Sequence, residues 1–140
     1  MKKYILFILI CVTNMSCEFY TSGNGDFDGF WQLRLLDSLK TGKSVDMRES
    51  GVYWGVQTDL LETSTRNIMV LFRFNLVGDS LFLREPYINN RDVSDMLVTD
   101  ATLLAPMGVN HINEGFRVIE LNGRTMVLQS DLLRLYFRKY

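Results

Sequence analysis

The strongest constraint on the fold lies in the C-terminal stretch of the chain, where short apolar runs are separated by turn residues. Residues 116–121 are rich in β-branched and aromatic side chains and are followed by Asn122-Gly123, the dipeptide that favours a type I′ hairpin turn. Residues 125–129 and 132–139 continue as two further apolar runs. This stretch therefore predicts three antiparallel strands joined as a meander.

In the last of these runs, apolar residues alternate with polar or amphipathic ones. The two sets are Leu133, Leu135 and Phe137 on one side and Arg134, Tyr136 and Arg138 on the other. Successive side chains of a strand point to opposite faces, so this period of two predicts a sheet with one buried and one wet face. A helix would scatter the same charges around its axis.

Upstream runs with a similar pattern predict four more strands. They cover residues 29–36, 50–61, 68–77 and 81–84. Gly78-Asp79-Ser80 predicts a hairpin turn between the last two, and Pro86 is expected to end the final one because proline has no backbone N–H to donate. Gly55 is interpreted as a bend or bulge. A weaker eighth run lies within residues 96–104, and residues 37–49, 62–67 and most of 87–115 are predicted to be loops or turns.

The N-terminus has the three parts of a secretory signal. Met1-Lys2-Lys3 is positively charged, residues 4–12 are apolar and uncharged, and polarity returns over residues 13–16 with Thr13, Asn14 and Ser16. The apolar core is shorter than the run of about 20 residues that spans a bilayer as a helix. An export signal over residues 1–16 is therefore predicted.

Cys17 directly follows the small residue Ser16 at the end of this segment, an arrangement that resembles the lipobox of bacterial lipoproteins. The resemblance implies cleavage between Ser16 and Cys17 and attachment of diacylglycerol to the Cys17 thiol. Asn14 departs from the pattern, because the family usually has an aliphatic residue there. The alternative is an ordinary signal peptide with an unmodified cysteine nearby.

The remaining chain is predicted to contain a short tether and one domain. Residues 17–28 include Gly23, Asn24 and Gly25 and have no apolar periodicity, so they are predicted to form a flexible tether. Residues 29–140 have a length that suits a single domain.

An all-β domain with this order of strands resembles the lipocalin-like, or calycin-type, domains of secreted lipoproteins from Bacteroidetes-type bacteria. The resemblance rests on the opening Gly29-Phe30-Trp31-Gln32-Leu33, the turn at residues 106–110 and the ending at residues 133–139. It implies a single antiparallel up-and-down β-barrel of about 7–8 strands whose interior holds one small hydrophobic molecule or is packed solid. The chain is shorter than true lipocalins and lacks their disulfide, which argues against a roomy cavity.

Aromatic residues on the predicted inner faces either line a pocket or fill a core. Under the pocket hypothesis, the wall residues are Trp54, Phe72, Phe74 and Phe137. A polar side chain projecting inward among them, such as Arg73 or Gln129, would then orient the ligand.

The sequence contains no recognisable set of catalytic residues or metal ligands. His111 is the single histidine and is interpreted as a lone surface residue, so a tetrahedral zinc site is not expected. Three aspartates, Asp92, Asp95 and Asp100, lack the spacing of a calcium loop. Phosphate-binding and nucleophile-elbow motifs are also missing from the sequence, so we expect neither an enzyme nor a bound cofactor or metal.

Two functional hypotheses remain from the sequence. The first is a lipid-anchored protein of the bacterial cell envelope, an outer-membrane lipoprotein facing the periplasm or the cell surface, that binds a small hydrophobic or amphipathic ligand. The second is a non-enzymatic structural or protein-interaction module in which a packed barrel presents its loops to an envelope protein. The chain has 15 basic and 16 acidic residues, a balance that does not favour a nucleic-acid partner.

Overall fold

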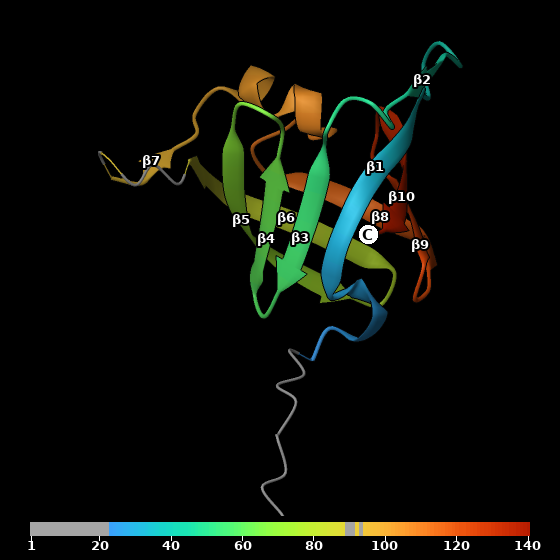
Figure 1. Cartoon of the computed structure of the whole chain (residues 1–140), viewed down its shortest axis with the longest axis horizontal. Helices are drawn as coiled ribbons and strands as arrows, with labels where there is room; N and C mark the ends of the chain where they lie inside the picture. The colour runs from blue at the N-terminus through green and yellow to red at the C-terminus, as the bar shows by residue number, and fades with distance from the viewer. Residues whose placement is uncertain (1–22, 89–91, 93) are drawn as a thin grey trace, which may run out of the picture.

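The computed structural model describes residues 23–88, 92 and 94–140, which form an antiparallel sheet closed on itself (Figure 1). The strands are β1 (Gly29–Ser38), β2 (Ser44–Asp46), β3 (Tyr53–Gln57), β4 (Leu60–Ser64), β5 (Met69–Val77), β6 (Ser80–Ile88), β7 (Met96–Leu97), β8 (Glu114–Leu121), β9 (Thr125–Gln129) and β10 (Leu133–Lys139). Three 3₁₀ turns accompany them: η1 (Gly25–Phe27), η2 (Ala101–Leu103) and η3 (Ala105–Met107). In this described part of the chain, no helix has the length and apolarity needed to cross a membrane.

Eight of the strands form the barrel. Their order around it is β10-β9-β8-β6-β5-β4-β3-β1, and pairing of β1 with β10 closes the ring. Each strand lies beside its neighbours in sequence, with β2 and β7 added to the edges of β1 and β6. The predicted all-β, up-and-down barrel is confirmed.

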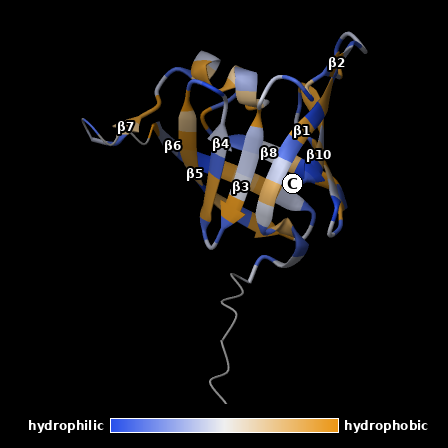
Figure 2. Cartoon of the chain, in the orientation of Figure 1, coloured by the Kyte–Doolittle hydropathy of each residue, from blue (hydrophilic) through white to orange (hydrophobic). Residues whose placement is uncertain are grey.

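The barrel has an apolar interior, as the alternating pattern predicts. Apolar residues run through the strands, whereas many connecting turns are hydrophilic (Figure 2). Trp31, Leu33, Trp54 and Phe72 are fully buried in one continuous core. A register shift between Leu33 and Leu35 changes the phase of β1, so Leu36 packs against the core although strict alternation after Trp31 and Leu33 would place Leu35 there.

The predicted strand at residues 50–61 is two strands of the barrel. Gln57 pairs with Leu60 across a two-residue turn at Thr58-Asp59, where Thr58 has a φ of 54°. This reversal turns Leu61 toward the core and leaves Leu60 outside. The turn contains no Gly or Asn, the residues that usually signal such a hairpin. The sequence pattern therefore predicted one strand over residues 50–61 instead of β3 and β4.

Pro86 does not end its strand, contrary to the prediction. Strand β6 continues to Ile88 because Glu85 and Pro86 lie together opposite a single residue of β5, between the Leu71–Tyr87 and Arg73–Arg84 pairs. Glu85 has a φ of 53° at this bulge. A bulge is one of the few places in a sheet that tolerates a proline.

Two predicted hairpin turns are confirmed in position, but one has a different geometry. Gly78-Asp79 connects β5 to β6, with a φ of 60° at Gly78. The chain also reverses at Asn122-Gly123, but neither residue has a positive φ, so the turn is not type I′. Instead, Oδ1 of Asn122 accepts hydrogen bonds from the N–H groups of Arg124 and Thr125, both at 2.9 Å.

One end of the barrel is covered by η2 and η3 (Figure 1). Of the predicted eighth strand at residues 96–104, only β7 is extended, and the chain then turns over the barrel. Leu104, Met107 and Val109 are fully buried there. The indole N–H of Trp54 donates to the Met107 carbonyl oxygen at 3.0 Å, which fixes this cap to β3.

The other end is covered by η1, within the stretch predicted to be a tether (Figure 1). Phe27 is fully buried, its ring packs edge-on against Phe74 with centroids 5.3 Å apart, and its carbonyl oxygen accepts a 2.9 Å hydrogen bond from the Trp31 indole. The folded domain therefore begins before Gly29. The predicted signal at residues 1–16 and Cys17 lie outside the described residues.

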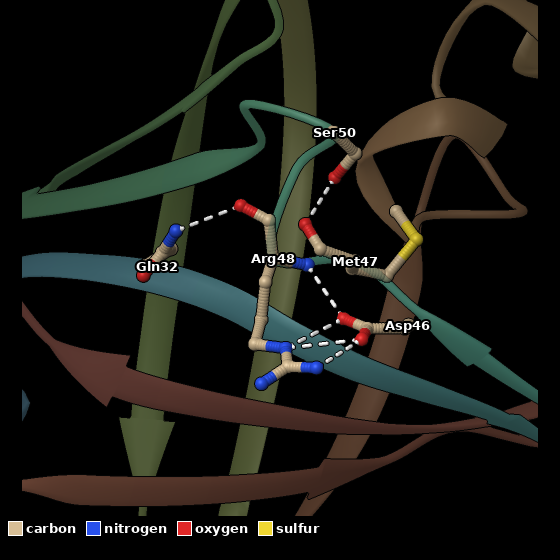
Figure 3. A network of polar contacts seen from close by, with 5 residues as sticks. All are labelled: Gln32, Asp46, Met47, Arg48 and Ser50. Carbon is tan, nitrogen blue, oxygen red and sulfur yellow. Dashed lines mark hydrogen bonds and ion pairs between the residues drawn. The ribbon is translucent and has the colours of Figure 1, made fainter.

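The predicted loop at residues 37–49 contains a hairpin, because β1 extends to Ser38 and pairs with β2. A polar network holds the chain that follows (Figure 3). Gln32 donates to the Arg48 carbonyl oxygen at 3.2 Å, and the Arg48 side chain pairs with Asp46. Hydrogen bonds from Arg48 lower the pKa of Asp46 to about 2. This network fixes the chain between β2 and β3 against β1.

Candidate functional site

The four aromatic residues predicted to line a pocket meet inside the barrel. Trp54 and Phe72 are fully buried, Phe137 is 3% exposed and Phe74 is 7% exposed. The Trp54 and Phe137 rings pack with centroids 4.8 Å apart, and Phe116 packs edge-on against Trp54 at 5.7 Å. These side chains pack against one another between two covered ends of the barrel, so they form its core.

Arg73 and Gln129 do not project inward among them, which corrects the prediction. Arg73 is exposed and forms ion pairs with Asp59 at 3.1 Å and Glu85 at 3.4 Å. The Gln129 side-chain oxygen accepts from the Arg134 guanidinium at 2.9 Å and 2.6 Å. Both lie on the outer face because they alternate with inward apolar residues of their strands.

A hollow of about 600 Å³ lies on the outer face of the barrel over β1, β3, β4 and β5, and we call it the outer groove. Its lining residues are Gly29, Phe30, Gly55, Val56, Gln57, Thr58, Leu60, Glu62 and Leu71. The volume lies within the range of about 300–1,000 Å³ that is typical of small-molecule sites.

Strand register explains why the outer groove forms at this place. Phe30 pairs with Gly55, Gly55 with Glu62, and Glu62 with Leu71, so the four residues form one row across four strands. The pairing is regular through Gly55, so this residue marks neither the bend nor the bulge that the sequence suggested. Because Gly55 has no side chain, it leaves a gap between Phe30 and Glu62 in this row. A Cβ atom at Gly55 would lie 3.4 Å from the Phe30 ring and 4.0 Å from the Glu62 Cβ.

The walls of the outer groove combine an aromatic ring, aliphatic side chains and a carboxylate. Phe30 is 40% exposed and stacks on Tyr53 with centroids 5.1 Å apart, while Tyr140 packs edge-on against both rings. Leu60 and Leu71 are half-buried. Among the described residues, no hydrogen bond or ion pair involves the Glu62 carboxylate. The groove therefore offers apolar surface beside an unpaired negative charge.

His111 is not the lone surface residue that the sequence suggested. Its Nε2 lies 3.2 Å from the Asp131 carboxylate, and Glu114 lies beside the pair. The Glu114 carboxylate accepts hydrogen bonds from the N–H groups of Asn110 and His111, at 2.9 Å and 3.1 Å. Burial raises the pKa of Glu114 above its usual value.

Asp92, Asp95 and Asp100 have no shared site in the described structure. Asp100 caps η2 by accepting a 3.0 Å hydrogen bond from the Thr102 N–H, and Asp92 and Asp95 are exposed.

The sequence analysis did not predict the outer groove, because it placed the candidate pocket on the inner faces of the strands. The available signal was Gly55, a glycine within an aromatic strand, since such a glycine marks either a bulge or a place where another group approaches the backbone closely. The cluster at His111 was missed because its three members become neighbours only in the folded chain.

Comparison with known proteins agrees with this architecture. Among solved structures, the chain is similar to a lipocalin-like protein from Bacteroides uniformis, with a TM-score of 0.59, 20% identity and coverage of 83% of this chain and 100% of that one. It is also similar to an uncharacterized protein from Bacteroides eggerthii, with a TM-score of 0.60, 23% identity and coverage of 81% and 98%. No curated protein matches the sequence.

The family comparison covers nearly the whole sequence. The family model for the lipocalin-like domain matches residues 9–140. The predicted resemblance to lipocalin-like proteins of Bacteroidetes-type bacteria is therefore confirmed, and the chain belongs to the family of lipocalin-like domains.

Proposed function

We propose that this protein is a lipid-anchored component of the bacterial cell envelope that binds a small, positively charged amphipathic ligand in the outer groove. The observation that carries the proposal is the row formed by Phe30, Gly55, Glu62 and Leu71. In this row Gly55 leaves room for the outer groove of about 600 Å³, which has apolar walls and an unpaired carboxylate. The apolar part of the ligand contacts Phe30 and Leu71. Its cationic group pairs with Glu62, and the ring of Phe30 also favours a nearby cation.

The anchor in this proposal is Cys17, and its support is the lipobox resemblance of the sequence. Six residue steps separate Cys17 from Gly23, where the described structure begins, so the anchor lies at most about 22 Å from the folded domain. The Asn24 side chain donates a 2.7 Å hydrogen bond to the Thr58 carbonyl oxygen, so the chain enters the domain beside one end of the outer groove. This placement suits a ligand that arrives from the membrane surface. An outer-membrane lipoprotein facing the periplasm or the cell surface fits the same arrangement.

Acylation of Cys17 is a direct prediction of the anchor. Mass spectrometry of the protein extracted from its native membrane is expected to find a diacylglyceryl adduct on Cys17 as the N-terminal residue. Replacing Cys17 by Ser removes the thiol and is expected to move the protein to the soluble fraction. A native protein with an unmodified cysteine, or with an N-terminus elsewhere, would contradict the anchor.

Decylamine is a suitable probe for the outer groove because it joins an apolar chain to an ammonium group. Burying about 300 Å² of apolar area contributes about 7 kcal/mol at about 25 cal/mol per Å². Association costs at least about 4 kcal/mol, and an exposed ion pair with Glu62 adds up to about 1 kcal/mol. The balance predicts a Kd of about 1 mM, which NMR titration measures well. Decanoate, with the same chain and the opposite charge, is expected to bind more weakly.

Filling the gap in the row tests the proposed site. Gly55→Val places a branched side chain against Phe30 and is expected to weaken decylamine binding at least about tenfold, because the apolar contact surface is lost. Gly115→Val is the matched control, since Gly115 is also a strand glycine on the exposed face but lies outside the groove. Glu62→Gln is expected to remove the preference for decylamine over decanoate. Equal binding by the wild type, Gly55→Val and Glu62→Gln would contradict the site.

A second candidate function, a protein-interaction module, is favoured by apolar side chains in the segment between β6 and β8. Met96 is 61% exposed, Leu97 65% and Leu103 44%. This alternative would be favoured if titration with decylamine left the NMR signals of all residues that line the outer groove unchanged. Substituting Met96 and Leu97 by Ser should then abolish co-purification of a partner without unfolding the barrel.

A further inference from the structure

Three potential metal ligands converge outside the outer groove. They are His111, from the segment before β8, Glu114, at the start of β8, and Asp131, from the turn between β9 and β10. One ligand atom from each lies within 4.8 Å of the other two. The cluster therefore joins two segments that are distant in sequence, and it contains an imidazole as well as two carboxylates.

Glu114 is the fixed member of the cluster. It is 3% exposed, and its Oε2 accepts the two backbone hydrogen bonds from Asn110 and His111. These bonds orient the carboxylate, although no Lys or Arg of the described residues pairs with it.

His111 and Asp131 are the adjustable members. Their side chains are 51% and 62% exposed, so both can change rotamer without disturbing the core. Tetrahedral zinc, with bonds of about 2.0–2.2 Å, holds its ligand atoms about 3.4 Å apart. His111 Nε2 and Asp131 Oδ2 are already 3.2 Å apart, and ligand atoms of all three residues lie within 4.8 Å of one another. Small movements of the two exposed side chains toward Glu114 would therefore complete three ligand positions.

The charges of the cluster also favour a divalent cation. Two carboxylates lie within 4.8 Å of one another in the cluster, and one of them is buried. Like charges at such a distance repel, and a divalent cation bound between them removes the repulsion. An imidazole ligand suits zinc better than calcium or magnesium, which prefer oxygen.

We propose that His111, Glu114 and Asp131 bind one zinc ion through one nitrogen and two oxygen ligands, with water in the remaining position. The ion then connects the segment before β8 to the turn between β9 and β10. Three protein ligands and an open position are also the arrangement of catalytic zinc sites.

Titration of the purified full-length protein with Zn²⁺ tests the site by calorimetry and by thermal unfolding. We expect one equivalent to bind with a micromolar Kd and to raise Tm, because a ligand that binds only the folded state stabilises it. Asp131→Asn and His111→Ala should each weaken zinc binding at least about tenfold and abolish the rise in Tm. Asp95→Asn is the matched control, since Asp95 is exposed but outside the cluster, and should behave like the wild type. Calcium and magnesium are expected to bind much more weakly than zinc.

Because His111 and Asp131 are exposed, we expect both variants to retain the barrel, and circular dichroism of each variant checks this. Zinc binding that persists unchanged in Asp131→Asn and His111→Ala would place the metal elsewhere, for example on a cysteine thiol, and would overturn the proposal. So would the absence of zinc binding to the folded wild-type protein at millimolar metal.

Discussion

Replacing Trp54 by Ala is expected to lower the free energy of unfolding by about 4 kcal/mol, because deleting a buried aromatic side chain typically costs about 3–5 kcal/mol. Trp54 is fully buried, contacts the rings of Phe116 and Phe137, and donates its indole N–H to the Met107 carbonyl oxygen. The substitution therefore leaves a cavity in the core and removes the bond that holds η3 over the barrel. Urea unfolding followed by circular dichroism measures the change.

Two further variants separate the contributions of Trp54. Trp54→Phe keeps an aromatic ring but leaves the Met107 carbonyl oxygen without its donor, and should cost about 1–3 kcal/mol. Tyr53→Ala removes the neighbouring aromatic residue, which is half-buried on the outer face, and should cost less than Trp54→Ala. Equal losses for Tyr53→Ala and Trp54→Ala would contradict a packed interior at Trp54.

The second large effect is expected at Gly108, where alanine should cost about 3 kcal/mol. Gly108 has a φ of 84°, a conformation that costs an L-residue about 1–2 kcal/mol. A Cβ atom there would also lie 2.9 Å from Cδ1 of Leu135, which is fully buried and cannot move aside freely. Such overpacking typically costs about 1–3 kcal/mol. Urea unfolding of Gly108→Ala gives the sum of the two terms.

Gly42→Ala is the matched control for the backbone term. Gly42 has a φ of 70°, but nothing lies within 4 Å of a Cβ atom placed there. Gly42→Ala should therefore lower the free energy of unfolding by only about 1–2 kcal/mol, which is the cost of the left-handed backbone conformation alone. If Gly108→Ala were no more destabilising than Gly42→Ala, the close packing of η3 against β10 would be contradicted.

Much of the barrel could be predicted from the sequence because its signals are local. Alternation in β5, β8 and β10 follows from the two faces of a strand, and the turns at Gly78-Asp79 and Asn122-Gly123 interrupt it clearly. The misses occurred where backbone geometry depends on a neighbouring strand. Thr58-Asp59 forms a tight turn without glycine, and Pro86 continues its strand only because a bulge accommodates it.

The candidate sites were less predictable because register and long-range contacts decide them. The sequence places Phe72 and Phe74 on an apolar face, but it does not say whether that face encloses a cavity or a packed core. Gly55 becomes the floor of the outer groove only when Phe30 and Glu62 lie on either side of it in the closed barrel. In the same way, His111 and Asp131 become neighbours only when β8, β9 and β10 are assembled.

The barrel interior is packed, and the proposed ligand binds outside it, in the outer groove. The chain has two tryptophans, Trp31 and Trp54, and both indole N–H groups are hydrogen-bonded to the caps at the ends of the core. The most direct test is a ¹H–¹⁵N NMR titration with decylamine. The amide signals of Gly29 and Gly55 should shift together while both indole signals stay unchanged. Shifts of the indole signals with the glycine amides unmoved would place the ligand inside the barrel and contradict binding in the outer groove.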